Sequence, residues 1–245
     1  MVMNSFFVVI ASRADAAAAR FAAGAGSLVR MMTPADLSQP GWSLHLPGTG
    51  PSTAVIAGEP VASRTIAGVL TRLPAVTEHD LPHIIAADRT YVAVEMTAFL
   101  LAWLTSLSCP LVNRPSAQCL SGPHWREAQW IRAANRLGIP AVPAMLGTRR
   151  TRPVHDEGED GTTSVVVIGR QHVGTADPVL VAHAHALADA AGVELLSVRF
   201  DGEGPSARFV AASMWPDLDD AGVSDAVLRL MRSRAAAHGD LREAG

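Results

Sequence analysis

The sequence predicts an α/β protein whose first domain is built around a parallel sheet. Strand-like and helix-like segments alternate along most of the 245 residues. The first three segments form a β-α-β pattern, the elementary unit of a parallel sheet. Apolar residues make up 49% of the chain and charged residues 18%, so a sizeable core can form.

The first elements are short and well separated. Residues 5–12, SFFVVIAS, form a continuous apolar run typical of a buried strand. Residues 13–26 are rich in alanine and end at Gly24 and Gly26, which predicts a helix. Residues 27–33, SLVRMMT, predict the next strand. A right-handed crossover between two parallel strands follows from this order.

The middle of the chain predicts further strands and two helices. Residues 33–42 have the composition of a short capped helical turn. Glycine and proline separate three strand-like pieces at 42–46, 52–58 and 68–74. A long apolar helix is predicted from His83 to Leu107, and a short strand over 109–115. Residues 124–138 form an amphipathic pattern that ends at Gly138.

A polar, glycine-rich stretch at 147–162 predicts a linker between a domain over 1–146 and a smaller α+β lobe over 163–245. The lobe begins with a strand or hairpin over 164–174. A helix follows over 177–192, with Asp177 as N-cap and Gly192 as its end. Two strands joined by a glycine-rich turn and a final helix over 224–239 complete it.

Composition excludes several classes of function. The net charge is −3 and there is no long basic run, so we expect no nucleic-acid partner. All 20 Lys and Arg residues are arginine, which excludes Schiff-base and P-loop lysine chemistry. Cys109 and Cys119 are too few for a disulfide framework, and we expect reduced thiols in a cytoplasmic protein. Residues 91–107 are short for a membrane span and contain Glu95, so we expect no membrane partner.

Three charged residues suggest a ligand-binding site. Arg72 and Arg114 each stand at the end of a predicted strand, where ligands bind in open α/β sheets. Glu95 lies in the apolar helix and, if buried, requires a cationic partner such as these arginines. Asn113 precedes Arg114 and either contributes to the site or forms a turn. The site would bind a small polar or peptide ligand; the alternative is a structural ion pair.

Three histidines raise the alternative of a metal. His183 and His185 are two positions apart on a predicted helix and therefore point to different faces, which is poor ligand geometry. His172 would have to join one of them. Surface or core histidines are the plainer interpretation.

The order of several motifs resembles ATP-grasp peptide ligases, which include ribosomal-peptide maturases. The segments that carry the resemblance are GVLTRLP (68–74), YVAVEMTAFLLAWLTSL (91–107), CPLVNRP (109–115) and WREAQWIRAANRLGIPAVP (125–143). Residues 188–218 are similar to the end of an ATP-grasp domain. The resemblance implies a pre-ATP-grasp-like domain followed by a remnant of the ATP-grasp C-terminal lobe.

The chain departs from the family in three ways that bear on ATP. Only about 20 residues lie between Pro143 and Val165, too few for the family's central ATP-binding subdomain. The family holds nucleotide phosphates with lysines, and this chain has none. The family's closing strand carries Glu and Asn ligands for Mg²⁺, whereas this chain has alanine, alanine, serine and methionine over 211–214. We therefore expect no ATP or Mg²⁺.

The resemblance implies an ATP-grasp homologue that has lost nucleotide binding. It would act as a binding or accessory protein in specialised peptide or amino-acid-derived metabolite biosynthesis. Whether the chain is an enzyme stays open. One alternative is ATP-independent chemistry in a cleft between the domains, with or without a metal held by histidines. Another is a homo-oligomeric or regulatory partner of an intact ligase, which an exposed apolar patch at Trp125, Trp130 or Trp215 would favour.

Overall fold

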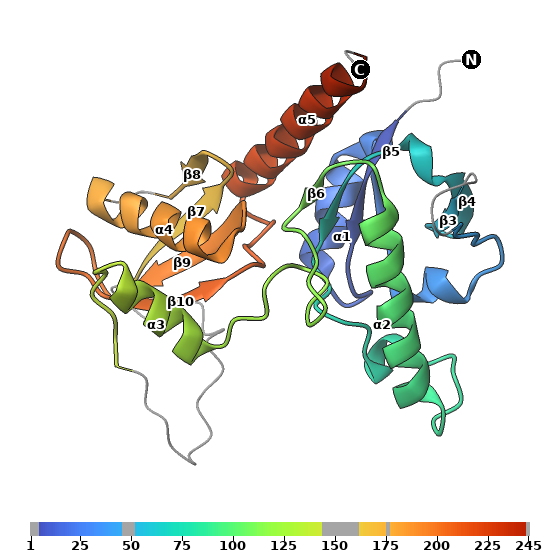
Figure 1. Ribbon diagram of the computed structural model, residues 1–245, viewed down its shortest axis with the longest axis horizontal. Coiled ribbons are helices and arrows are strands. Elements are labelled where there is room, and N and C mark those ends of the chain that lie inside the picture. Colours follow the sequence, from blue (N-terminus) through green and yellow to red (C-terminus); the bar gives the residue numbers. More distant parts are fainter. Residues whose placement is uncertain (1–4, 46–51, 144–161, 175–176, 244–245) are drawn as a thin grey trace. The chain divides into compact units, whose positions relative to one another are not determined.

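The computed structural model describes residues 5–45, 52–143, 162–174 and 177–243 (Figure 1). The chain divides into two compact units. The parallel-sheet unit comprises residues 1–123 and 217–245, and the antiparallel-sheet unit comprises residues 124–216. These bounds differ from the predicted domains in two ways: the helix predicted over 124–138 belongs to the second unit, and the final helix belongs to the first. The predicted linker at 147–162 lies outside the described residues except for Thr162.

The first unit contains a four-stranded parallel sheet in the order β2-β1-β5-β6. Its strands are β1 (Phe6–Ile10), β2 (Val29–Met32), β5 (Ile66–Thr71) and β6 (Leu111–Val112). The crossover between β1 and β2 contains α1 (Ala16–Gly24) and the 3-10 turn η1 (Gly26–Leu28). The predicted β-α-β start and the α/β class are confirmed.

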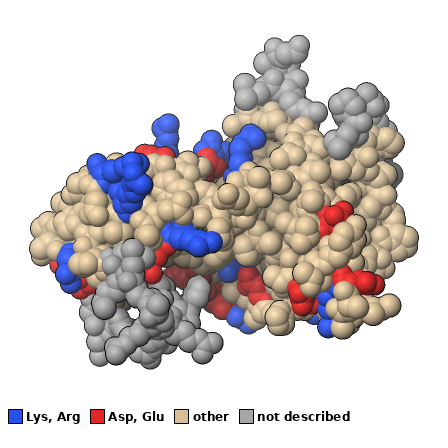
Figure 2. All heavy atoms as spheres, turned by 60° about the horizontal axis from the view of Figure 1, so that its bottom comes forward, with Lys and Arg blue, Asp and Glu red and all other residues tan. Residues whose placement is uncertain are grey.

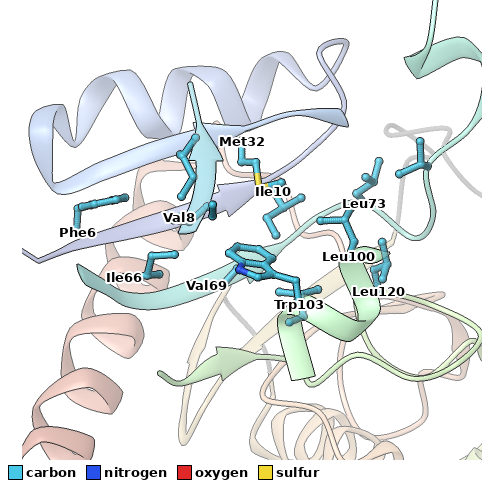
Figure 3. Close-up of a cluster of buried hydrophobic side chains, with 14 of the residues drawn as sticks. Phe6, Val8, Ile10, Met32, Ile66, Val69, Leu73, Leu100, Trp103 and Leu120 are labelled. Carbon is cyan, nitrogen blue, oxygen red and sulfur yellow. The ribbon is translucent and has the colours of Figure 1, made fainter. Parts of the chain in front are cut away.

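Helices cover both faces of the parallel sheet. Phe6, Val8 and Ile10 pack in one cluster with Leu100 and Trp103 of α2 (Arg89–Ser106) (Figure 3). The alternate residues of β1 are also buried and face the opposite side. There α1 packs against β2, and α5 (Ala221–Glu243) packs against β5. The sheet is therefore buried on both faces, which explains the uninterrupted apolar run of β1.

A buried aspartate joins β2 to the segment that follows it. Thr33 caps the 3-10 turn η2 (Pro34–Ser38), and its backbone N–H donates to Asp36 Oδ2 at 2.8 Å. Asp36 Oδ1 accepts from the Gly58 N–H at 2.8 Å, at the turn between β3 (Thr53–Ile56) and β4 (Glu59–Ala62). The Asp36 carbonyl accepts from Trp42 Nε1. The Asp36 side chain therefore satisfies backbone N–H groups of two segments, and its backbone carbonyl binds a third.

The long helix differs from its prediction in both start and orientation. It begins at Arg89 rather than His83, after the 3-10 turn η4 (Glu78–Asp80). Its fully buried residues are Leu100, Trp103 and Leu104, whereas Tyr91 and Glu95 are exposed. Apolar residues occupy nearly all sides of this helix, so the sequence does not indicate which side is buried.

The second unit is built on an antiparallel sheet in the order β10-β9-β7-β8. Its strands are β7 (Thr163–Ile168), β8 (Gln171–Val173), β9 (Leu195–Phe200) and β10 (Phe209–Ser213). Helix α3 (Glu127–Arg136) packs against β10, and α4 (Pro178–Ala191) packs against β7 and β9. Asp177 caps α4, and Gly192 ends it with a left-handed φ of 66°, as predicted.

Replacing Trp103 with alanine should reduce the free energy of unfolding by roughly 3–5 kcal/mol, because the residue is fully buried and its removal leaves a cavity. Denaturant unfolding monitored by circular dichroism measures this change. Tyr91→Ala, on the exposed side of the same helix, should change it by less than about 0.5 kcal/mol. Equal losses in the two variants would contradict the orientation of α2.

Candidate functional site

The carboxyl ends of the parallel strands form the candidate site. Strand β1 lies between β2 and β5, and α1 and α2 lie on opposite faces of the sheet (Figure 3). The connections that follow β1 and β5 therefore diverge, which makes this the topological switch point of the sheet. Ligands of open α/β proteins bind in the crevice that such divergence creates.

Arg72 stands at this edge, as the sequence predicted, but its carboxylate partner is Asp15. Arg72 Nε lies 2.8 Å from Asp15 Oδ2, and the two side chains are only 8% and 19% exposed. The other oxygen of Asp15 accepts from the Ala18 N–H and caps α1. The backbone N–H of Arg72 donates to the Ile10 carbonyl at 2.7 Å. Arg72 therefore joins β5 to both β1 and the start of α1.

The other predicted binding residues do not assemble around Arg72 as a charge cluster. Glu95 is exposed on α2, and among the described residues it forms no ion pair, so the predicted pairing with Arg72 or Arg114 is wrong. Arg114 is exposed as well. Asn113 is buried with a φ of 54°, a left-handed conformation that asparagine tolerates better than most residues. The left-handed turn at the end of β6 explains why an asparagine occupies position 113.

A cavity of about 660 Å³ opens at the same edge. Its walls come from the loops that follow β1 (12–14), β2 (33–39) and β5 (79–83). Three segments far apart in sequence therefore meet there because parallel strands end at one edge. The volume lies within the range of small-molecule sites, about 300–1,000 Å³.

A fixed carboxylate lies in the wall of this cavity. Asp80 Oδ1 accepts from Ser12 Oγ at 2.6 Å, which ties the loop after β5 to the loop after β1. Asp80 Oδ2 accepts from the backbone N–H and the hydroxyl of Thr77 at 2.9 and 2.7 Å. Three neutral donors hold the carboxylate in place without cancelling its charge.

Cationic and polar side chains face the same cavity. Arg13 is exposed, and within the described part of the chain it forms no hydrogen bond or ion pair. His83 Nε2 lies 2.8 Å from Ser38 Oγ, and His79 is exposed. The cavity therefore presents an arginine, an aspartate and two imidazoles among apolar walls.

The three histidines considered as metal ligands belong to the second unit. The rings of His172 and His185 lie with their centroids 6.3 Å apart. Nδ1 of His183 is buried, and no partner for it is found among the described residues. No group of three or more His, Cys, Asp or Glu side chains in the described ranges can hold a metal. The predicted triad is therefore not assembled, since helical neighbours two positions apart diverge.

Neither cysteine has the lowered pKa that a nucleophilic thiol requires. Cys109 and Cys119 are free thiols. Burial raises the pKa of Cys109 to about 11, and burial also raises the pKa of Cys119. The reactive thiolate is therefore scarce at neutral pH.

Charge on the surface is dispersed. On the face shown in Figure 2, arginines and carboxylates occur in small groups separated by uncharged surface. A continuous basic stripe, which nucleic-acid binding requires, is not seen on that face. None of the helices in the described ranges combines the length and apolarity needed to cross a membrane.

Solved structures with a similar fold include a macrocyclase and ATP-grasp ligases. The macrocyclase MdnC from Microcystis aeruginosa MRC, bound with precursor peptide MdnA, is 10% identical, with a TM-score of 0.65 over 93% of this chain and 99% of that one. The ATP-grasp ligase PsnB complexed with precursor peptide PsnA2 and AMPPNP is 13% identical, with a TM-score of 0.64 over 93% and 98%. The chain has an ATP-grasp-like fold.

A third ATP-grasp-like structure agrees with these two. The RiPP-associated ATP-grasp ligase of Chryseobacterium gregarium, in complex with ADP and a leader and core peptide, is 11% identical, with a TM-score of 0.64 over 94% of this chain and 97% of that one. No protein-family model matches the sequence, and no curated protein matches it either. The resemblance predicted from the sequence is thus confirmed for the fold.

The sequence predictions missed the cavity residues Arg13, His79, Asp80 and His83. A local signal was present: a threonine three residues before an aspartate follows both β2 and β5, as Thr33 with Asp36 and Thr77 with Asp80. Such pairs cap helical turns and place a carboxylate near a strand end. Capping motifs after successive parallel strands therefore indicate where the edge of the sheet presents fixed charges.

The Arg72→Gln variant should lose about 3 kcal/mol of unfolding free energy, because Asp15 keeps a largely buried charge without its partner. Urea unfolding measures the loss. Arg114→Gln, at an exposed arginine of the same unit, should change stability by less than about 0.5 kcal/mol. A stable Arg72→Gln variant would show that the pair does not hold the edge together.

The thiols should resist alkylation in the folded protein. With the pKa of Cys109 near 11, about one part in a thousand is thiolate at pH 8. Iodoacetamide should modify neither cysteine quickly at pH 8, and the rate should rise as the pH approaches the raised pKa. Mass spectrometry follows the reaction, with the urea-unfolded chain as the control in which both cysteines react. Rapid modification at pH 7 would contradict the burial of these thiols.

Proposed function

We propose that this protein is an ATP-grasp-like binding or accessory protein that has lost nucleotide binding. It would act in the biosynthesis of a specialised peptide or an amino-acid-derived metabolite. Its task would be to hold a substrate or a partner enzyme rather than to activate a carboxylate with ATP.

One observation carries the loss of nucleotide binding. In the family that the sequence resembles, the closing strand of the ATP-grasp domain supplies Glu and Asn ligands for Mg²⁺. The corresponding strand here is β10, which pairs with β9 and reads FVAAS, followed by Met214. Hard cations require several oxygen ligands, and Ser213 offers a single hydroxyl. The absence of lysine from the whole sequence supports the same conclusion.

The likeness to ligases solved with precursor peptides supports a role in peptide biosynthesis. MdnC was solved with the peptide MdnA, and PsnB with the peptide PsnA2. A protein that keeps such a fold without the means to hold Mg²⁺ can still bind a peptide or amino-acid derivative. The cavity at the carboxyl edge of the parallel sheet is the candidate site for that ligand.

A second candidate function is that of a partner subunit for an intact ligase or for another copy of the chain. The exposed apolar residues Ile85, Tyr91 and Val94, at and just before the start of α2, favour it. The tryptophans considered from the sequence do not form this surface. Trp130 is buried, and Trp125 packs against it with ring centroids 4.7 Å apart.

Titration with ATP and Mg²⁺ tests the loss of nucleotide binding. A ligand that binds only the folded state and is present at 100 times its Kd adds about 2.7 kcal/mol to stability. Because we propose that the chain does not bind ATP, we expect millimolar ATP and Mg²⁺ to leave the melting temperature unchanged and to give no binding heat in calorimetry. The AMPPNP-bound relative PsnB, run in parallel, is the positive control. Saturable binding of ATP to this chain would refute the proposal.

A further inference from the structure

Two opposite charges line the cavity of the parallel-sheet unit without neutralising each other. Arg13 follows β1, and Asp80 follows β5. Among the described residues no ion pair joins the Arg13 guanidinium to the Asp80 carboxylate. A cavity wall with separated charges of opposite sign is complementary to a ligand with two separated charges.

The carboxylate is held in a fixed position before any ligand arrives. Ser12 binds one oxygen of Asp80, and Thr77 binds the other through its backbone N–H and its hydroxyl. A carboxylate has about four lone-pair sites, so three donors leave room for one more. An ammonium group is the donor that its negative charge favours most.

Arg13 supplies the opposite charge on the adjacent loop. Its neighbour Ser12 is tied to Asp80, so the two loops keep the charges in the same cavity. The guanidinium presents a planar set of donors that matches a carboxylate in bidentate geometry. Arg13 forms no hydrogen bond or ion pair with any described residue, so these donors are available to a ligand.

The rest of the cavity limits the kind of ligand. The lining carries one formal positive charge, on Arg13, and one formal negative charge, on Asp80. A ligand with several negative charges, such as a nucleoside triphosphate, would find one arginine and a repelling carboxylate. Ala14, Pro34, Ala35 and Pro82 provide apolar walls for an uncharged body. The volume of about 660 Å³ leaves room for more than one amino-acid residue.

We propose that this cavity binds a zwitterionic amino-acid-derived ligand, either a free amino acid or a short peptide with both ends free. Its carboxylate would bind Arg13, and its ammonium group would bind Asp80. The inference rests on the proposed role as a binding protein and narrows the class of its ligand. The proposed binding site consists only of residues of the parallel-sheet unit.

Blocked dipeptides test the inference directly. The probes are Ala-Leu with free ends, its N-acetylated form and its C-amidated form, titrated by calorimetry or by NMR. Each blocked form should bind at least roughly tenfold more weakly than the free dipeptide, because it loses one charge-assisted contact. Equal affinity for all three forms, or no binding of any of them, would overturn the inference.

Variants assign each charge to its partner. In Arg13→Gln, C-amidation should no longer matter, whereas N-acetylation should still weaken binding. In Asp80→Asn the pattern should be reversed. Arg64→Gln, an exposed arginine before β5 and outside the cavity lining, should bind all three probes like the wild type. Unchanged discrimination in Arg13→Gln would place the ligand elsewhere and overturn the inference.

Two features keep the outcome decisive. Arg13 is exposed, so Arg13→Gln should fold normally and decides the matter even if Asp80→Asn is unstable. Failure of this inference is also distinguishable from failure of the proposed function. ATP binding, measured separately, refutes the loss of nucleotide binding, while the dipeptide results alone determine whether this cavity takes a zwitterion.

Discussion

The ion pair between Asp15 and Arg72 is the contact on which the candidate site depends. It joins residues 57 positions apart, at 2.8 Å, where the loop after β1 meets the end of β5. The same carboxylate caps α1, so strand end, loop and helix start are fixed together. Largely buried charges are stable only with such partners, and breaking the pair would leave one of them unmatched. Ala14, which lines the cavity, directly precedes Asp15 in the chain, so the pair anchors this part of the cavity wall.

The charges at the carboxyl edge fall into two groups with different roles. Asp15 with Arg72 and Arg20 with Asp219 are matched within the protein; the second pair joins α1 to the segment before α5 with an Nε to Oδ1 distance of 2.7 Å. Both side-chain oxygens of Asp36 likewise accept hydrogen bonds from backbone N–H groups. Arg13 and Asp80 face the cavity without an opposite charge from the described chain. Charges matched within the protein are thus distinct from the two that the proposed site would present to a ligand.

Local sequence patterns predicted the elements well, and long-range partners poorly. Caps and glycine stops defined α4, and the apolar run of residues 5–12 identified β1, because these signals act within a few residues. The side of α2 that is buried was not predictable, since apolar residues surround that helix, and Glu95 consequently proved exposed. Arg72 was correctly placed at a strand end, but nothing local indicates that Asp15 is its partner. Helix α5 packs in the first unit although it is distant from the rest of that unit in sequence, and no local pattern indicates this packing either.

An NMR titration of the 245-residue protein with the free dipeptide Ala-Leu is the most direct test of the proposed site, because it reports where the ligand binds. Backbone amide shifts should change in segments 12–14 and 79–83 of the cavity wall, while amides of the antiparallel-sheet unit stay unchanged. Changes concentrated in residues 124–216, or no saturable changes at all, would contradict the claim that the carboxyl edge of the parallel sheet is the ligand site.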